Sequence, residues 1–136
     1  MTDVGRIIGV DDADWDPTIF EPHHDVITEY TQVQIYEAIL GTTDLEVTRT
    51  LLRASRYLKD NRIVPPGFDP LAAPDDVRPV GGCMNDDDFA SGSDDIGYRI
   101  ENLTGSEFHV TVELRHQSIS YPYVEDLREF DDPTIS

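Results

Sequence analysis

The sequence predicts an all-β fold: an antiparallel β-sandwich, jelly-roll-like, with at most one short helix near residues 48–59. The clearest observation is the run FHVTVELR at 108–115, in which apolar and polar residues alternate. A period of two is typical of an antiparallel strand with one buried face. The other apolar runs are short and end in proline, glycine or aspartate, a pattern that favours several strands joined by turns.

The expected elements are separated by turn-forming residues. The segment 48–58 is ambiguous, because its apolar residues fit both a helical stripe and a period of two. Pro65 and Pro66 interrupt the chain after it, since neither a helix nor a central strand continues through consecutive prolines. We expect an edge strand at 4–10, a half-buried strand at 31–40, a hairpin of 98–101 with 108–115, and a short strand at 119–123.

The composition excludes several classes of protein. The 136 residues include 28 acidic and 10 basic side chains, for a net charge of −18. A nucleic acid is not an expected partner, because phosphate contacts need clustered lysine and arginine. No apolar run approaches the roughly 18 residues of a membrane span, so we expect no membrane insertion. Cys83 is the one cysteine, which excludes a disulfide framework and a C-x-x-C-H haem attachment motif in this chain.

The acidic composition has three interpretations. Adaptation to a saline environment, halophilic or marine, would explain it, because high ionic strength screens the repulsion between carboxylates. Cation binding and solubility are the alternatives. Since 38% of the residues are hydrophobic and fall in patterned blocks, we expect one folded domain over residues 1–136 with acidic loops.

Taken together, four stretches of the chain resemble a known family. They are EPHHDVI at 21–27, QVQIYEAIL at 32–40, LLRASRYLKDNRIVPPGFD at 51–69 and DDDFASGSDDIGYRIE at 86–101. In this order they resemble the C-terminal, haem-free, β-rich region of bacterial proteins related to multihaem c-type cytochromes. The resemblance covers most of the chain.

The resemblance implies a periplasmic or cell-envelope location. It also implies a supporting role, with the haem-bearing region of the same or another protein as the partner. It assigns no catalytic residue and, without a C-x-x-C-H motif, no haem to this chain. Because Met1 is not followed by a signal peptide, we expect a fragment of a longer protein.

An acidic loop at 86–95 is the candidate metal site. Calcium takes six to eight oxygen ligands, and flexible loops rich in aspartate supply them. The spacing is not that of an EF-hand, and a solvated loop whose aspartates cap turns is the alternative. The candidate ligands are Asp86, Asp88, Asp94 and Asp95.

Two further groups of residues are candidates for binding. Arg53, Arg56, Lys59 and Arg62 concentrate positive charge in an acidic chain, and would dock an acidic surface or form internal ion pairs. Trp15, among aspartates, would stack on a sugar ring or cover the end of the core.

Histidine and the catalytic motifs contribute less. His23 and His24 are adjacent and would point to opposite faces of a strand, so joint ligation of one metal is not expected. The alternatives are a site of His23 or His24 with Asp25 and a distant histidine, and histidines that are simply exposed or hydrogen-bonded. No G-x-S-x-G elbow or phosphate-binding glycine motif occurs. An enzyme is therefore not expected.

The sequence thus predicts a non-catalytic accessory or interaction domain of a redox-associated envelope protein. The alternative is a calcium-dependent carbohydrate-binding module. No cofactor other than calcium is a candidate in this chain, and the oligomeric state stays open. An upstream C-x-x-C-H region in the same reading frame would favour the first function, and a glycosidase domain the second.

Overall fold

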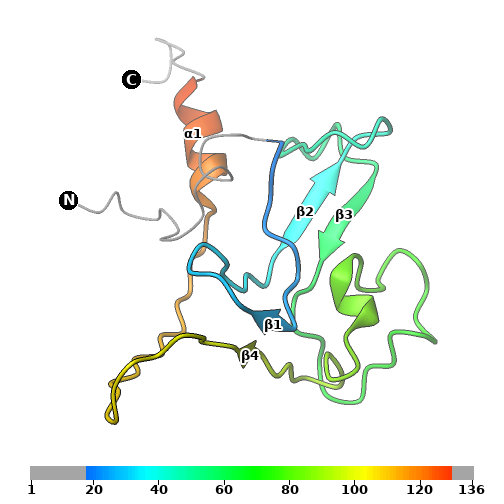
Figure 1. Cartoon of the computed structure of the whole chain (residues 1–136). Helices are drawn as coiled ribbons and strands as arrows, with labels where there is room; N and C mark the ends of the chain where they lie inside the picture. The colour runs from blue at the N-terminus through cyan, green and yellow to red at the C-terminus, as the bar shows by residue number, and fades with distance from the viewer. Residues whose placement is uncertain (1–17, 130–136) are drawn as a thin grey trace.

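The computed structural model describes residues 18–129, with short regular elements joined by long irregular segments (Figure 1). Within these residues the strands form two separate two-stranded sheets. In chain order the elements are β1 (Val26–Ile27), β2 (Ala38–Gly41), β3 (Arg56–Asp60), the 3-10 helix η1 (Gly82–Asn85), β4 (Gly97–Tyr98) and α1 (Tyr121–Glu129).

The predicted β-sandwich is therefore wrong for the described part of the chain. A sandwich needs two sheets packed face to face over a shared apolar core. Here each sheet has two short strands, and many large apolar side chains stay in solvent, Leu52 and Leu114 among them at 97% and 94% exposed. The expected edge strand at 4–10 lies outside the described residues.

An irregular antiparallel pair, β2 with β3, forms the larger sheet. Ile39 pairs with Lys59 and Leu40 with Tyr57, so Leu58 is left over as a β-bulge. Gly41 makes the bulge sterically acceptable, since a Cβ there would lie 2.6 Å from two carbons of Leu58. Only the end of the strand expected at 31–40 forms. The segment 48–58, which fitted a helix or a strand, forms no helix, and its end enters β3.

The smaller sheet is a parallel pair that corrects the predicted hairpin. β1 pairs with β4, so Val26 lies opposite Gly97 and Ile27 opposite Tyr98. Tyr98, at the start of the strand expected at 98–101, therefore pairs with β1. The segment 108–115 has no partner among the described residues and forms no strand, because a ladder needs hydrogen-bonding groups on both sides.

A small apolar core lies beside these sheets. Val64, Cys83 and Phe89 are buried together, with Tyr36, Phe68 and Met84 packed partly against them. Lys59 and Asn61 are buried as well, at 2% and 0% exposed. The interior therefore depends on polar contacts as much as on apolar burial, and each buried polar group needs a partner.

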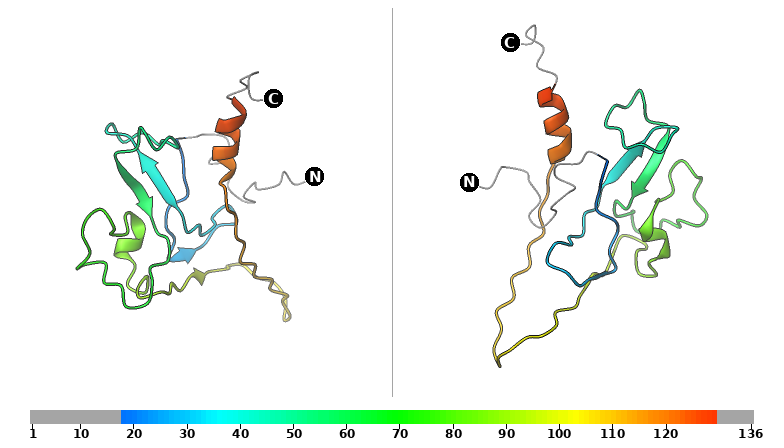
Figure 2. Two further views of the ribbon diagram at one scale, coloured as in Figure 1. Left: turned by 180° about the vertical axis from the view of Figure 1, so that it is seen from behind. Right: turned by 45° about the horizontal axis from the view of Figure 1, so that its top comes forward.

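Residues 99–120, called the arm below, project away from the sheets and return to α1 (Figures 1 and 2). Every residue of the arm is exposed and none is in a helix or strand. Within the arm, Asn102 and Gly105 have positive φ, of 58° and 134°.

The helix of the described chain, α1, lies where a short strand was expected at 119–123. Pro122 explains the difference, because proline lacks an N–H and fits the first turn of a helix better than the interior of a strand. An ion pair of 3.4 Å between Arg49 and Asp126 joins α1 to the rest of the molecule. Within residues 18–129 no helix is both long and apolar enough to cross a bilayer.

Candidate functional site

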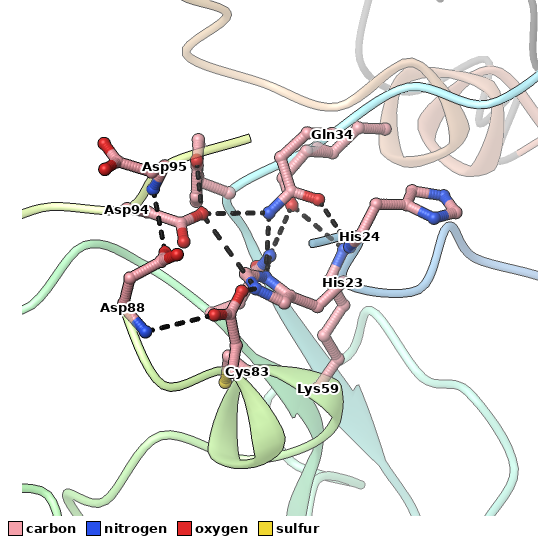
Figure 3. A network of polar contacts seen from close by, with 12 residues as sticks. His23, His24, Gln34, Lys59, Cys83, Asp88, Asp94 and Asp95 are labelled. Atoms are coloured by element: carbon pink, nitrogen blue, oxygen red, sulfur yellow. Dashed lines mark hydrogen bonds and ion pairs between the residues drawn. The ribbon is translucent and has the colours of Figure 1, made fainter. Parts of the chain in front are cut away.

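A cluster of one histidine and three aspartates is the main concentration of chemistry in the described structure (Figure 3). His23 comes from the segment before β1, Asp86 directly follows η1, and Asp88 and Asp94 belong to the acidic loop before β4. We call these four residues the aspartate cluster. One ligand atom each of His23, Asp86 and Asp94 lie within 4.8 Å of one another.

A tight turn folds the acidic loop so that its two halves meet. Ala90 and Ser93 exchange two backbone hydrogen bonds of 3.2 Å. Between them Ser91 and Gly92 have φ of 53° and 95°, as a type I′ turn requires. The Ser91 hydroxyl accepts a 2.9 Å hydrogen bond from the backbone N–H of Gly67, which fixes the tip of the turn.

The two halves of the loop are also joined by side-chain contacts. Asp86 Oδ1 accepts the backbone N–H of Asp88 at 3.2 Å, and Asp88 Oδ1 accepts that of Asp95 at 3.0 Å. These contacts, the first of which is an Asx turn, order the aspartates without neutralising their charge. A second group of ligand atoms within 4.8 Å joins Asp86 and Asp88 to Asp25, beside β1.

His23 is held on three sides. Its ring packs edge-on against Phe89, with centroids 5.3 Å apart. Nε2 lies 2.9 Å from Asp86 Oδ2, and Nδ1 faces the side-chain amide nitrogens of Gln34 at 2.8 Å and Asn61 at 3.0 Å. Both ring nitrogens are therefore engaged by side chains.

Asp94 is the most buried carboxylate of the cluster. Its side chain is 0% exposed, and Oδ2 accepts a 2.5 Å hydrogen bond from the Tyr36 hydroxyl. Among the described residues, Oδ1 has no hydrogen-bond partner. Burial raises the pKa of Asp94 above its usual value, and the charges of Asp86 and Asp88 raise that pKa further, whereas the hydrogen bond from Tyr36 lowers it.

The structure brings three of the four predicted metal ligands together. Asp86, Asp88 and Asp94 lie in the aspartate cluster, whereas the carboxylate of Asp95 points away from it and only its backbone N–H takes part (Figure 3). The sequence placed Asp25 only in an alternative site with His23 or His24 and a distant histidine, whereas the structure groups it with Asp86 and Asp88. Its position depends on the pairing of β1 with β4, which no local pattern indicates.

The predicted basic patch is not a continuous surface. Arg53 and Arg56 are exposed, but Arg62 forms an ion pair of 2.6 Å with Asp60 and lies over the Tyr57 ring. Lys59 is buried. Its ammonium donates to the backbone oxygens of Glu21 and Ile35 at 2.7 and 3.0 Å, and to Glu37 at 3.2 Å.

The remaining candidate residues lie outside the aspartate cluster or outside the described part of the chain. Trp15 lies outside the described residues. His24 does not join the cluster, and its Nε2 lies 2.9 Å from Glu21. Cys83 is 1% exposed, and burial raises the pKa of its thiol to about 11.

No sequence pattern indicates the polar residues that hydrogen-bond to the aspartate cluster. Tyr36, Gln34 and Asn61 are isolated residues in unremarkable stretches, and the tertiary structure alone directs them toward His23 and Asp94. The chain matches no protein-family model, no curated protein and no solved structure.

Proposed function

We propose that the chain is a non-catalytic interaction module that binds a protein partner through its arm. The observation that supports this function is the alternating segment 108–115, which is exposed on both faces. Within residues 18–129 it forms no backbone hydrogen bond to another strand. An unpaired extended segment offers its N–H and C=O groups to the sheet edge of another protein, where alternate side chains enter pockets.

The apolar side chains of the arm give such contact its driving force. Val110, Val112 and Leu114 are 71%, 79% and 94% exposed, and they alternate with polar residues. Burial of each would contribute about 1.5–3 kcal/mol. With a net charge of −18, this chain favours a partner whose exposed strand edge is flanked by lysine and arginine. By the family resemblance, the partner would be a haem-bearing region in the cell envelope.

The surroundings of the reactive side chains support a non-catalytic role. Cys83 is buried with a pKa of about 11, so it is a thiol rather than a nucleophilic thiolate at neutral pH. His23 has side-chain partners at Nδ1 and Nε2 and offers no free nitrogen to a substrate proton.

A crosslinking experiment followed by a binding measurement tests the proposal. Benzoylphenylalanine in place of Phe108 puts a photoreactive ring on the arm without removing its aromatic character. The protein that it captures is then purified, and its affinity for the wild-type chain is measured. Hydrogen exchange should show protection at 108–115 in the complex.

Two double variants separate the faces of the arm. Val112→Thr with Leu114→Gln should weaken binding at least about tenfold, because two apolar contacts are lost. The matched control, His109→Gln with Thr111→Ser, should bind like wild type. Neither should shift the melting temperature, since the arm is exposed. Equal affinity of both variants, an arm that exchanges freely in the complex, or crosslinks only between copies of this chain would contradict the proposal.

A further inference from the structure

We propose that the aspartate cluster is a binding site for a hard divalent cation of the calcium class, coordinated by carboxylate oxygens only. In this site Asp86, Asp88 and Asp94 are ligands, Asp25 lies at the rim, and His23 positions Asp86 without touching the ion. This inference is independent of the arm and goes beyond an interaction function.

The first argument is the buried oxygen of Asp94. A carboxylate oxygen removed from water needs a donor or a cation, and Oδ1 has neither within the described structure. Tyr36 holds the other oxygen at 2.5 Å, so the carboxylate is fixed with Oδ1 directed away from that contact. An acidic loop that was merely solvated would leave this oxygen in water.

The second argument is the spacing of the ligand atoms. Calcium binds oxygens at about 2.3–2.6 Å, so oxygens on opposite sides of one ion are about 5 Å apart. The atoms of the two groups that share Asp86 lie within 4.8 Å of one another in each group. Asp86 and Asp94 are therefore close enough to share one ion, and so are Asp86 and Asp88.

The third argument concerns the protonated nitrogen of His23. Asn61 faces His23 Nδ1 with its amide nitrogen, because its Oδ1 accepts the N–H of Glu37 at 2.9 Å and its Nδ2 also donates to the oxygen of Ile35 at 2.8 Å. A flip of this amide would break both contacts.

Gln34 also faces His23 Nδ1 with an N–H donor. Its Oε1 accepts the N–H of His24 at 2.8 Å, which leaves Nε2 to face His23 Nδ1 at 2.8 Å. Since two N–H donors converge on it, Nδ1 is an acceptor. The ring proton is therefore on Nε2 and is donated to Asp86.

This tautomer decides the class of metal. A histidine ligand must present an unprotonated nitrogen, and the Nε2 that faces the aspartates carries a proton. Zinc prefers nitrogen and sulfur ligands, so to bind it His23 would have to move its ring proton from Nε2 to Nδ1. That proton would then face the two amide N–H donors that are fixed beside Nδ1. A cation that takes oxygens alone requires no such change.

The charge balance agrees with a divalent ion. Lys59 directs its ammonium to Glu21, Ile35 and Glu37 and not to the aspartate cluster. Asp86, Asp88 and Asp94 together would thus be neutralised largely by the bound cation. Crowded carboxylates without a cation repel one another.

Titration of the purified chain with calcium and zinc chloride, starting from chelator-treated protein, tests the site. At a hundredfold excess of calcium over its dissociation constant, the melting temperature should rise by roughly 5–10 °C. Asp94→Asn keeps the acceptor for Tyr36 and should abolish this rise. Asp95→Asn removes the same charge from the same loop, and should retain it because that carboxylate points away.

Nitrogen-15 NMR of the His23 ring provides a second readout that does not depend on stability. With calcium bound, Nε2 should stay protonated and Nδ1 unprotonated, with both shifts nearly unchanged. Three results would overturn the proposal: no calcium-dependent shift in melting temperature, the same shift in Asp94→Asn, or tighter zinc binding with loss of the Nε2 proton.

Discussion

Among the single residues, Cys83 shows how burial changes the chemistry of a reactive group. Its Sγ lies 3.5 Å from the backbone oxygen of Asp60 and 3.8 Å from that of Val80, and the charge of Lys59 offsets the loss of water only in part. Burial is the largest cause of the raised pKa, and the charge of Asp60 is the next. The residue is thus a small apolar core residue rather than a nucleophile.

The folded protein should lose stability in strong base through Cys83. The thiol titrates near its ordinary 9.0 in the unfolded chain and at about 11 in the folded one. The neutral thiol therefore stabilises the fold fully below pH 9, and this contribution, about 3 kcal/mol, disappears as the pH rises to 11. Urea unfolding across this range, with Cys83→Ala as the control, measures it. Parallel pH profiles for both proteins would refute the prediction.

Among the elements, the turn at 90–93 has the clearest consequence for the site. It brings Asp88 and Asp94 together, and it needs a residue with positive φ at Gly92. The turn also packs closely on the preceding loop, since a Cβ on Gly92 would lie 3.0 Å from Cγ of Pro66. The geometry of the acidic loop therefore depends on this glycine.

Gly92→Ala should destabilise the protein by about 1–3 kcal/mol, because strain at positive φ adds to a steric clash. Gly67→Ala is the matched control, with φ of 83° but nothing within 4 Å of the added Cβ. Gly67→Ala should lose only the stability that a positive φ costs a residue with a Cβ. Thermal unfolding of both variants gives the comparison, and an equal loss of stability would show that the contact with Pro66 is unimportant.

For the whole molecule, the small core and the large charge are linked. Ile27, Val64, Cys83, Phe89 and Tyr121 are the buried apolar residues of the described chain. So few core residues leave little stability to oppose the self-repulsion of a chain with a net charge of −18. Screening by salt and binding of a cation would both relieve this repulsion, but by different routes.

Potassium chloride at molar strength should raise the melting temperature of the chelator-treated protein, because screening weakens repulsion between all exposed carboxylates. Asp94→Asn should respond to this salt as much as wild type does, since screening needs no coordination shell. A thermal shift series in potassium chloride without calcium measures the effect. A melting temperature independent of salt would argue that the acidic surface does not limit stability.

The sequence by itself determined the character of the acidic loop and the absence of known catalytic motifs. Aspartate, serine and glycine at 86–95 specify turns through local contacts, so three of the proposed ligands could be named without a structure. Alternation at 108–115 likewise identified an extended segment, but not its missing partner.

Tertiary structure decided everything that depends on contacts between distant parts of the chain. It paired β1 with β4, placed His23 against Asp86, and buried Lys59 instead of leaving it on a basic surface. The sandwich was wrong for the same reason: a period of two describes which residues could share a face, but a sheet forms only where another strand supplies hydrogen bonds and an apolar surface.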